Sequence, residues 1–174
     1  LLEKYPPTDP VLDIGCGSGD LAIYLAQLGH RALGIDFVES AITDARRKLD
    51  ALRPETAQLL DFRVADALKP SLLQKKFGAV VDSGFYHLFS SDQCDQLADE
   101  VALTLLPEGR YYLHEFAIEF PVPNVPRQVT AGELQARFTA DKGWRIIDIQ
   151  SVEFLTRFMP PVPAICACIE RLPS

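Results

Sequence analysis

The sequence lacks any apolar run that approaches the roughly 20 residues needed to span a bilayer, so no membrane-spanning segment is expected. It is also poor in basic residues: 17 Lys and Arg face 24 Asp and Glu, which gives a net charge of -7. Proteins that bind nucleic-acid backbones normally carry a basic stripe, and only short basic clusters occur here. Nucleic acid and anionic membranes are therefore not expected as partners.

Cysteine is present four times but without a C-x-x-C motif or a zinc spacing that includes His; the positions are Cys16, Cys94, Cys166 and Cys168. We therefore expect neither a metal site nor a disulfide framework. Free buried thiols are typical of a reducing compartment, and the chain opens without a signal-peptide pattern. These two features predict a cytoplasmic protein.

The length of 174 residues fits one domain, residues 1–174, with a single hydrophobic core. A chain of this size can bury roughly 70% of its unfolded surface, so it needs no cross-links to hold that core. A separate substrate domain does not fit this length. If the protein binds a cofactor, its substrate site must be built from loops on the same sheet.

Strand-like and helix-like patterns alternate along the first two thirds of the chain. The spacing predicts strands at residues 11–14, 31–36, 60–65, 77–83 and 110–116, and helices at residues 20–28, 40–52 and 91–106. Pro54 is expected to stop the second helix, and residues 107–109 to form a turn. Strands joined by helical crossovers imply a parallel sheet with helices on both faces.

The pattern changes after residue 116. Residues 117–129 form a proline-punctuated loop, which we assign to the substrate side, and Thr130 with Glu133 matches a capping box that opens a helix to about Lys142. Strand-like runs follow at residues 144–155 and 164–171, and their short connection predicts an antiparallel pair. The fold class is therefore α/β, with a seven-stranded, mostly parallel sheet whose last strand is antiparallel.

Glycines and acids carry the clearest sign of a ligand site. The first strand runs into Gly15, Gly17 and Gly19, and glycines at such a turn allow positive φ and let a ligand lie against bare backbone. Acidic residues follow the next three strands, at Asp36, Asp66 and Asp82. The carboxyl ends of neighbouring parallel strands line one crevice, and an acid after the second strand can bind both hydroxyls of a ribose.

The dinucleotide fingerprint G-x-G-x-x-G would place its last glycine where this sequence has Asp20. A carboxylate at that helix start would repel a pyrophosphate. The motif therefore favours a nucleoside ligand without phosphates over NAD.

These residues together resemble a class I S-adenosylmethionine-dependent methyltransferase, and the resemblance spans nearly the whole chain. It implies a Rossmann-like fold with S-adenosylmethionine as cofactor. Residues 80–89 are similar to small bacterial methyltransferases of the thiopurine and thiol or halide kinds. The Asn-Pro-Pro-Tyr type of motif, found in enzymes that methylate amide nitrogens and nucleobases, is missing.

The resemblance also implies roles for individual residues. Asp13 orients the glycine loop and reaches toward the methionine ammonium, and Asp36 holds the ribose. The other implied cofactor contacts are Gly15, Cys16 and Gly17 under the methionine part, Phe37 beside the adenine, Asp66 with the Ala67 N–H at the adenine edge, and Asp82 with Ser83 at the end of the fourth strand.

Several residues near the expected methyl position have two readings. His87 is either a general base or substrate ligand, or a histidine that anchors its loop. His114 and Glu115 alternate on the fifth strand, so one of them is expected to face the substrate. Phe85 and its aromatic neighbours either wall a pocket or belong to the core. Arg127, in the proline-rich loop, either contacts an anionic substrate or is solvated, and we expect the second.

The resemblance predicts in-line methyl transfer to a small-molecule acceptor. Two alternatives stay open at this point: an NAD(P)-dependent oxidoreductase, which shares the glycine turn and the ribose acid, and a non-catalytic S-adenosylmethionine-binding module. Only ten residues precede the first strand, whereas the family usually has a helical segment there. We therefore expect an N-terminal lid to be missing and the substrate pocket to be open.

Overall fold

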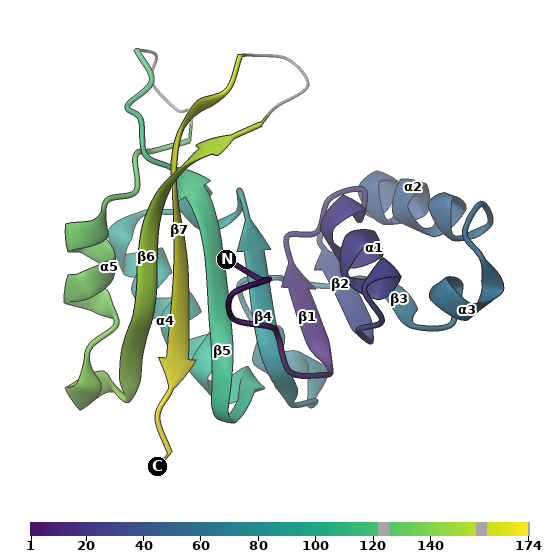
Figure 1. Ribbon diagram of the computed structural model, residues 1–174, viewed down its shortest axis with the longest axis horizontal. Coiled ribbons are helices and arrows are strands. Elements are labelled where there is room, and N and C mark those ends of the chain that lie inside the picture. The colour runs from purple at the N-terminus through teal and green to yellow at the C-terminus, as the bar shows by residue number, and fades with distance from the viewer. Residues whose placement is uncertain (122–125, 156–159, 174) are drawn as a thin grey trace.

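A computed structural model describes residues 1–121, 126–155 and 160–173. Its seven strands form one sheet in the order β3-β2-β1-β4-β5-β7-β6 (Figure 1). The strands are β1 (Val11–Ile14), β2 (Ala32–Asp36), β3 (Leu60–Val64), β4 (Phe77–Ser83), β5 (Leu105–Phe116), β6 (Trp144–Phe154) and β7 (Val162–Arg171). The helices are α1 (Asp20–Gln27), α2 (Glu39–Leu49), α3 (Pro54–Ala57), α4 (Ser91–Thr104) and α5 (Ala131–Arg137), with 3₁₀ turns η1 (Pro70–Leu73), η2 (Tyr86–Leu88) and η3 (Ala140–Lys142).

The sheet is parallel from β3 to β5, and β7 runs antiparallel to both of its neighbours, β5 and β6. The predicted fold class is therefore confirmed. Strand order reverses at β1, which pairs with β2 on one side and β4 on the other. In open α/β sheets this reversal leaves a crevice at the carboxyl ends of the strands. The fold thus brings the loops after β1, β2 and β4 to one edge.

Helices cover both faces of the sheet (Figure 1). One core cluster packs α4 and α5 against the sheet through side chains such as Leu97, Val101 and Leu134. The other packs α1 and α2 against the opposite face through Leu25 and Ile42. These apolar residues recur at the spacing of one helix face, which is why their helices lie flat on the sheet.

Residues 1–5 lie along the α1 face of the sheet rather than away from it. The Tyr112 hydroxyl donates a hydrogen bond of 2.9 Å to the Tyr5 carbonyl, and Lys4 forms a 2.9 Å ion pair with Asp148. Leu1 and Leu2 pack against the second core cluster. The first residues of the described chain therefore cover part of the sheet next to β5.

One predicted helix boundary is wrong. The helix expected to reach residue 106 ends at Thr104, because Leu105 is buried and pairs with Phe77 as the first residue of β5. The turn expected at residues 107–109 instead lies within β5, where a bulge shifts the register of its pairing with β4. Burial of Leu105 against the sheet outweighs the helical spacing that precedes it.

Two other helices also end earlier than predicted. α5 stops at Arg137 instead of Lys142, because Phe138 leaves the helix and packs its ring against Tyr111 and Trp144, with centroids 6.0 and 5.3 Å away. α2 stops at Leu49, and Pro54 starts the short helix α3. The fixed φ of proline suits the first turn of a helix, so Pro54 begins an element that the sequence pattern did not reveal.

Three findings bear on the expected absences. The four cysteines are all free thiols. Among residues 1–121, 126–155 and 160–173, no group of His, Cys, Asp or Glu side chains is arranged to hold a metal ion. In the same ranges, no helix has both the length and the apolar character required to cross a membrane.

Candidate functional site

The turn between β1 and α1 leaves an open face of bare backbone. Gly15 and Gly17 have φ of +63° and +51°, in the left-handed region that favours glycine. A Cβ on Gly15 would lie 2.3 Å from the Phe85 ring, whereas a Cβ on Gly17 would meet no atom within 4 Å. Gly15 is therefore required for packing, and Gly17 leaves space that a ligand can fill.

Asp36 lies at the end of β2, directly beside this turn. Its Oδ2 accepts a 2.9 Å hydrogen bond from the Gly17 N–H, and its Oδ1 accepts one of 2.9 Å from the Val38 N–H. Each carboxylate oxygen keeps a further lone pair for a ligand hydroxyl. The next residue, Phe37, is 71% exposed, so its ring is available to an apolar ligand face.

The loop after β3 lies next to the loop after β2, since Asp36 pairs with Val64 in the sheet. The Asp66 side chain is exposed, and its Oδ1 accepts a 3.0 Å hydrogen bond from the Leu68 N–H. Ala67 is buried beside it. The structure therefore brings these two residues to the same rim as Asp36, as the resemblance implied.

Cys16 occupies the middle of the glycine turn. Its side chain is half-buried and is directed at Gly34, where an added Cβ would lie 2.9 Å from Sγ. Burial raises the pKa of the Cys16 thiol, so the group stays neutral. Cys16 therefore contributes packing and backbone to the turn rather than a thiolate.

Two of the predicted cofactor-binding acids, Asp13 and Asp82, are buried and accept hydrogen bonds from other residues of the protein. Asp13 is 2% exposed, accepts a 3.1 Å hydrogen bond from the Ala22 N–H, and has a pKa that burial and the neighbouring Asp82 raise to about 8. Asp82 is also 2% exposed, and burial, followed by repulsion from Glu115, raises its pKa. Both carboxyls hold loops in place.

Asp82 fixes the loop after β4. Its Oδ1 accepts hydrogen bonds of 3.0 and 3.3 Å from the N–H groups of Phe85 and Tyr86, and its Oδ2 accepts one of 2.9 Å from the Tyr111 hydroxyl. Phe85 and Tyr86 are themselves buried, so they belong to the core rather than to a pocket wall.

His87 and Glu115 form a buried pair at this loop. His87 Nδ1 lies 2.6 Å from Glu115 Oε2, which also accepts a 3.2 Å hydrogen bond from the His87 N–H. Burial lowers the pKa of His87 to about 4 and raises that of Glu115 to about 7. Nδ1 itself makes no hydrogen bond to the described residues, so His87 is tied to Glu115 through its backbone N–H and through the short Nδ1–Oε2 distance.

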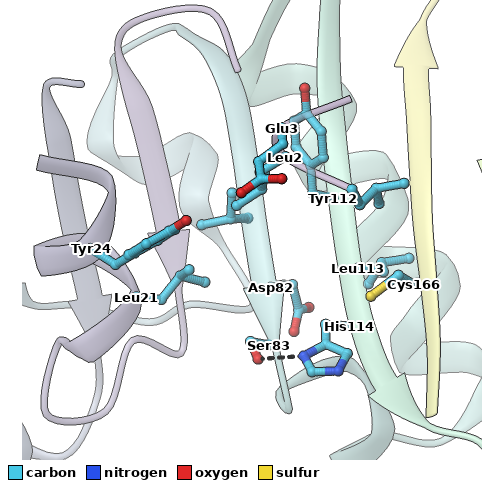
Figure 2. Close-up of a pocket in the computed structure, with 12 residues that line it drawn as sticks. Leu2, Glu3, Leu21, Tyr24, Asp82, Ser83, Tyr112, Leu113, His114 and Cys166 are labelled. Atoms are coloured by element: carbon cyan, nitrogen blue, oxygen red, sulfur yellow. Dashed lines mark hydrogen bonds between the residues drawn. The ribbon is translucent and has the colours of Figure 1, made fainter. Parts of the chain in front are cut away.

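A cavity of about 420 Å³ lies between α1 and the ends of β4 and β5 (Figure 2). Leu21 and Tyr24 line it from α1, and Ser83 and His114 line its lower end in the view, where Ser83 Oγ and His114 Nδ1 are 3.3 Å apart. Of the two candidates on β5, His114 therefore faces the cavity, while Glu115 points to the opposite side and meets His87.

Arg127 is not the solvated residue that the sequence suggested. Its backbone N–H donates a 3.0 Å hydrogen bond to the His87 carbonyl, and its Nε donates one of 2.6 Å to the Phe89 carbonyl. Its guanidinium also forms a 2.7 Å ion pair with Glu133. The expected capping box is half formed, because Thr130 Oγ1 accepts from the Glu133 N–H while the Glu133 carboxylate binds arginines. Arg127 thereby ties the end of the 117–129 loop to η2.

Sequence reasoning missed two of these contacts. It singled out His87 and Glu115 separately, but the pairing depends on the register of β4 and β5, which no local motif reports. It also missed the clamp around Arg127, whose partners come from α4 and α5. Within the predicted 117–129 loop, residues 122–125 lie outside the described ranges.

Comparison with known proteins adds an independent line of evidence. A family model described as "Methyltransferase domain" matches residues 11–109. A 2-heptyl-1-hydroxyquinolin-4(1H)-one methyltransferase from Mycobacteroides abscessus is 29% identical over 150 residues, which cover 86% of this chain and 64% of that protein. The chain thus spans slightly less than two thirds of this relative's length.

Solved structures share the fold. One described as "Conversion of a Disulfide Bond into a Thioacetal Group during Echinomycin Biosynthesis" has a TM-score of 0.80 and 28% identity, over 98% of this chain and 79% of that chain. The magnesium protoporphyrin IX methyltransferase from Synechocystis PCC 6803, solved with bound S-adenosylmethionine, has a TM-score of 0.73 and 21% identity, over 97% and 73% of the two chains. At that identity the second likeness concerns the fold alone.

The buried carboxyl of Asp13 predicts a pH-dependent stability. Its pKa in the folded protein is raised to about 8, so the folded state holds a proton that the unfolded chain releases near pH 4. The contribution of Asp13 to the free energy of unfolding is therefore fully present below pH 4 and is lost as the pH rises to about 8. The upper limit set by linkage is about 1.4 kcal/mol for each pH unit in that window.

Replacement by Asn removes this titration and keeps an acceptor for the Ala22 N–H. We expect the melting temperature of Asp13→Asn, relative to wild type, to rise between pH 5 and about pH 8 in thermal denaturation and then to level off. Asp44→Asn, at an exposed carboxylate paired with Arg47, is the control and should follow the wild type. A difference that stays constant across this range would contradict the assignment.

Proposed function

The chain belongs to the methyltransferase domain family and has the fold of class I S-adenosylmethionine-dependent methyltransferases, and we propose that it methylates a small-molecule acceptor. S-adenosylmethionine supplies a methyl group on a sulfonium sulfur, a bond already activated toward displacement. One observation carries the proposal: Asp36 accepts a hydrogen bond from the Gly17 N–H, at a glycine where an added Cβ would meet no described atom within 4 Å.

The cofactor contacts follow from this arrangement. Asp36 is proposed to bind the ribose hydroxyls, and Phe37 to contact the adenine ring, for which its exposed side chain is suited. Asp66 and the Ala67 N–H are proposed at the adenine edge. The remaining proposed contacts are Gly15, Cys16 and Gly17 at the methionine part, Ser83 at the end of β4, and Asp13 and Asp82 through the loops that they hold.

The family match, rather than the charge of Asp20, is the argument against a dinucleotide-dependent oxidoreductase. Lys48 Nζ lies 2.6 Å from the Asp20 carboxylate, so the charge at the start of α1 is partly compensated. The repulsion expected toward a pyrophosphate is weaker than the sequence alone suggested. Family membership and the matching fold favour the methyltransferase.

Two observations support a small-molecule acceptor. The cavity beside β4 and β5, about 420 Å³, is within the range of roughly 300–1,000 Å³ typical of small-ligand sites. The relative from Mycobacteroides abscessus is named for a hydroxyquinolinone acceptor. The acceptor is therefore proposed to bind at the ends of β4 and β5, next to the cofactor.

His87 is proposed as the general base when the acceptor must lose a proton. Its Nδ1 lies 2.6 Å from the Glu115 carboxylate, and its Nε2 lies 3.9 Å from the position of a Cβ added to Gly84. The neutral imidazole can accept a proton at Nε2 while Glu115 stabilises the resulting charge. Alignment of the two reactants in neighbouring sites lowers the activation barrier further, by up to roughly 7–11 kcal/mol in favourable cases.

The ribose assignment predicts a large loss of affinity in Asp36→Ala. Removal of hydrogen bonds to a charged carboxylate is expected to weaken S-adenosylmethionine binding by at least about 100-fold, because each such bond contributes about 1.5–3 kcal/mol. Isothermal titration calorimetry measures this directly. Asp44→Ala, which removes an exposed carboxylate from α2, should bind as the wild type does. Unchanged affinity in Asp36→Ala would refute the assignment.

The open face at Gly17 can be tested with a matched pair of glycines. Gly17 and Gly29 both have positive φ, at +51° and +97°, and neither has a described atom within 4 Å of an added Cβ, so Gly→Ala strains the backbone at both positions without a steric clash. Only Gly17 lies at the proposed cofactor face. We expect Gly17→Ala to weaken S-adenosylmethionine binding about tenfold or more, and Gly29→Ala to leave it unchanged. Equal affinities in the two variants would remove Gly17 from the site.

The His87–Glu115 pair predicts a pH dependence of turnover. Glu115 can stabilise a protonated His87 only when Glu115 is ionised, and burial raises the pKa of Glu115 to about 7. Methylation of a hydroxyl acceptor should therefore increase as pH rises through about 7 and then level off. His87→Gln should lower kcat by roughly 10²–10⁴-fold and remove this dependence, with S-adenosylmethionine affinity unchanged.

His30→Gln is the control. His30 pairs with Asp9, outside the proposed site, so this variant should keep the wild-type pH dependence of turnover. A His87→Gln variant that retains the wild-type rate and pH profile would leave His87 with its other role, that of a loop anchor.

A further inference from the structure

A second cavity, of about 360 Å³, lies at the amino ends of the parallel strands, which form the lower edge of the sheet in Figure 1. The residues that lead into β1, β2, β3 and β4 line it. The proposed cofactor site is at the carboxyl ends of the same strands. The 5 residues of β2 separate the two places by roughly 13 Å, at about 3.3 Å per residue. A ligand in the second cavity is therefore too far from the cofactor site to accept a methyl group.

Apolar residues contribute one part of the lining of the second cavity. Ala32, Leu33 and Phe77 are buried in the fold, whereas Leu59 and Leu60 are only half-buried. A ligand that covers the exposed part of these leucines removes apolar surface from water, which favours binding. The volume is within the range of roughly 300–1,000 Å³ typical of small-ligand sites.

Cationic residues contribute the other part. Arg31 leads into β2, and Lys75 and Lys76 lead into β4; all three are exposed. Among the described residues that line the cavity, Asp61 is the only acid, and its carboxylate forms a 2.7 Å ion pair with Arg63. The lining therefore has an excess of positive charge, in a protein whose net charge is -7.

No carboxylate in the described part of the chain compensates these cations. The ion pairs found there include neither Arg31, Lys75 nor Lys76. Lys76 Nζ donates a 2.5 Å hydrogen bond to the Leu103 carbonyl, which does not neutralise its charge. Other exposed arginines pair with an acid two or three residues away: Arg47, Arg53 and Arg63.

The backbone of Arg31 is held at both of its polar groups. Its N–H donates a 3.1 Å hydrogen bond to Asp9 Oδ2, and its carbonyl accepts one of 2.8 Å from the Val11 N–H. This side of the cavity is therefore formed before a ligand arrives, which lowers the conformational cost of binding.

The first cavity, of about 420 Å³ beside β4 and β5, has the opposite charge character. Its described lining includes Glu3 and Asp82 but neither Lys nor Arg. An organic anion is therefore favoured at the amino ends of the strands and disfavoured at the proposed acceptor site.

We propose that the second cavity binds a small amphipathic anion, with its acidic head group at Arg31, Lys75 and Lys76 and its apolar body against Leu60 and Phe77. A carboxylate or a phosphate monoester can supply the head group, since both bind guanidinium and ammonium groups. The cavity volume limits the ligand to a small molecule, and the net charge of -7 repels a polyanion. The proposal goes beyond methyl transfer and does not depend on it.

A matched ligand series tests the proposal on the wild-type protein. The series contains 4-phenylbutyrate, 4-phenylbutan-1-ol and 4-phenylbutylamine, which share one apolar body and carry a negative, a neutral and a positive group. In isothermal titration calorimetry we expect 4-phenylbutyrate to bind about tenfold more tightly than the alcohol, with an affinity that falls as NaCl is added, and the amine not to bind.

Phenyl phosphate is titrated in parallel and shows whether a phosphate monoester binds in place of a carboxylate. Binding of either acid in preference to the alcohol supports the proposal. Equal affinities of 4-phenylbutyrate and the alcohol, or no binding of either acid, would overturn it.

The cations are tested by substitution. The double variant Arg31→Gln/Lys75→Gln should weaken 4-phenylbutyrate binding roughly tenfold and leave the affinity for the alcohol unchanged. Lys69→Gln is the control, at an exposed lysine of the same β3–β4 connection that does not line the cavity. An unchanged affinity for 4-phenylbutyrate in the double variant would contradict the proposal.

S-adenosylmethionine affinity is measured on the same preparations and should be equal in all of them. If S-adenosylmethionine does not bind to any of them, the proposed function fails, while the anion site is still decided by the 4-phenylbutyrate titrations.

Methyl NMR locates the bound anion. On addition of 4-phenylbutyrate the methyl resonances of Leu59 and Leu60 should shift, and those of Leu21, which lines the first cavity, should not. Shifts at Leu21 without shifts at Leu59 and Leu60 would place the anion in the first cavity and overturn the proposal.

Discussion

The buried carboxyl of Asp82 is the contact on which the candidate site depends. It ends β4 and accepts hydrogen bonds from two backbone N–H groups of the following loop and from the Tyr111 hydroxyl of β5. These bonds fix Phe85, whose ring packs on Gly15, and the turn that carries His87. A buried polar group without partners would cost several kcal/mol, so the loop has one stable arrangement. The β1–α1 turn and His87, the proposed base, are thus positioned by one side chain.

The same centre concentrates acids where solvent cannot screen them. Asp13, Asp82 and Glu115 are buried at the ends of three adjacent strands, and repulsion between neighbours adds to burial in raising the pKa of Asp13 and of Asp82. The raised pKa means that Asp13 holds a proton near neutral pH, so burial lowers the negative charge of this centre instead of concentrating it.

The sequence predicted the sheet and the rim of the site because both depend on local patterns. Buried strands, the glycine turn and the acids at strand ends can each be read within about ten residues, and parallel topology then brings Asp36 and Asp66 together. Three sets of contacts could not be predicted in this way: the His87–Glu115 pair, the bonds around Arg127, and the ring contact between His114 of β5 and Phe154 of β6. Each joins residues 28 or more positions apart or depends on the β4–β5 register. The predicted helix ends were wrong where burial of a single side chain, Phe138 or Leu105, stabilises the protein more than another helical turn would.

The position of β7 has a consequence for how the chain is assembled. β7 lies between β5 and β6, although β6 precedes it in the sequence, and it is the strand that joins β6 to the rest of the sheet. During synthesis β6 therefore emerges before its neighbour exists and waits as an unpaired strand. The sheet closes only when residues 162–171 have left the ribosome and docked on β5. Phe154 of β6 and His114 of β5, whose rings are 4.3 Å apart, are consequently brought together across a strand that follows both of them in the sequence.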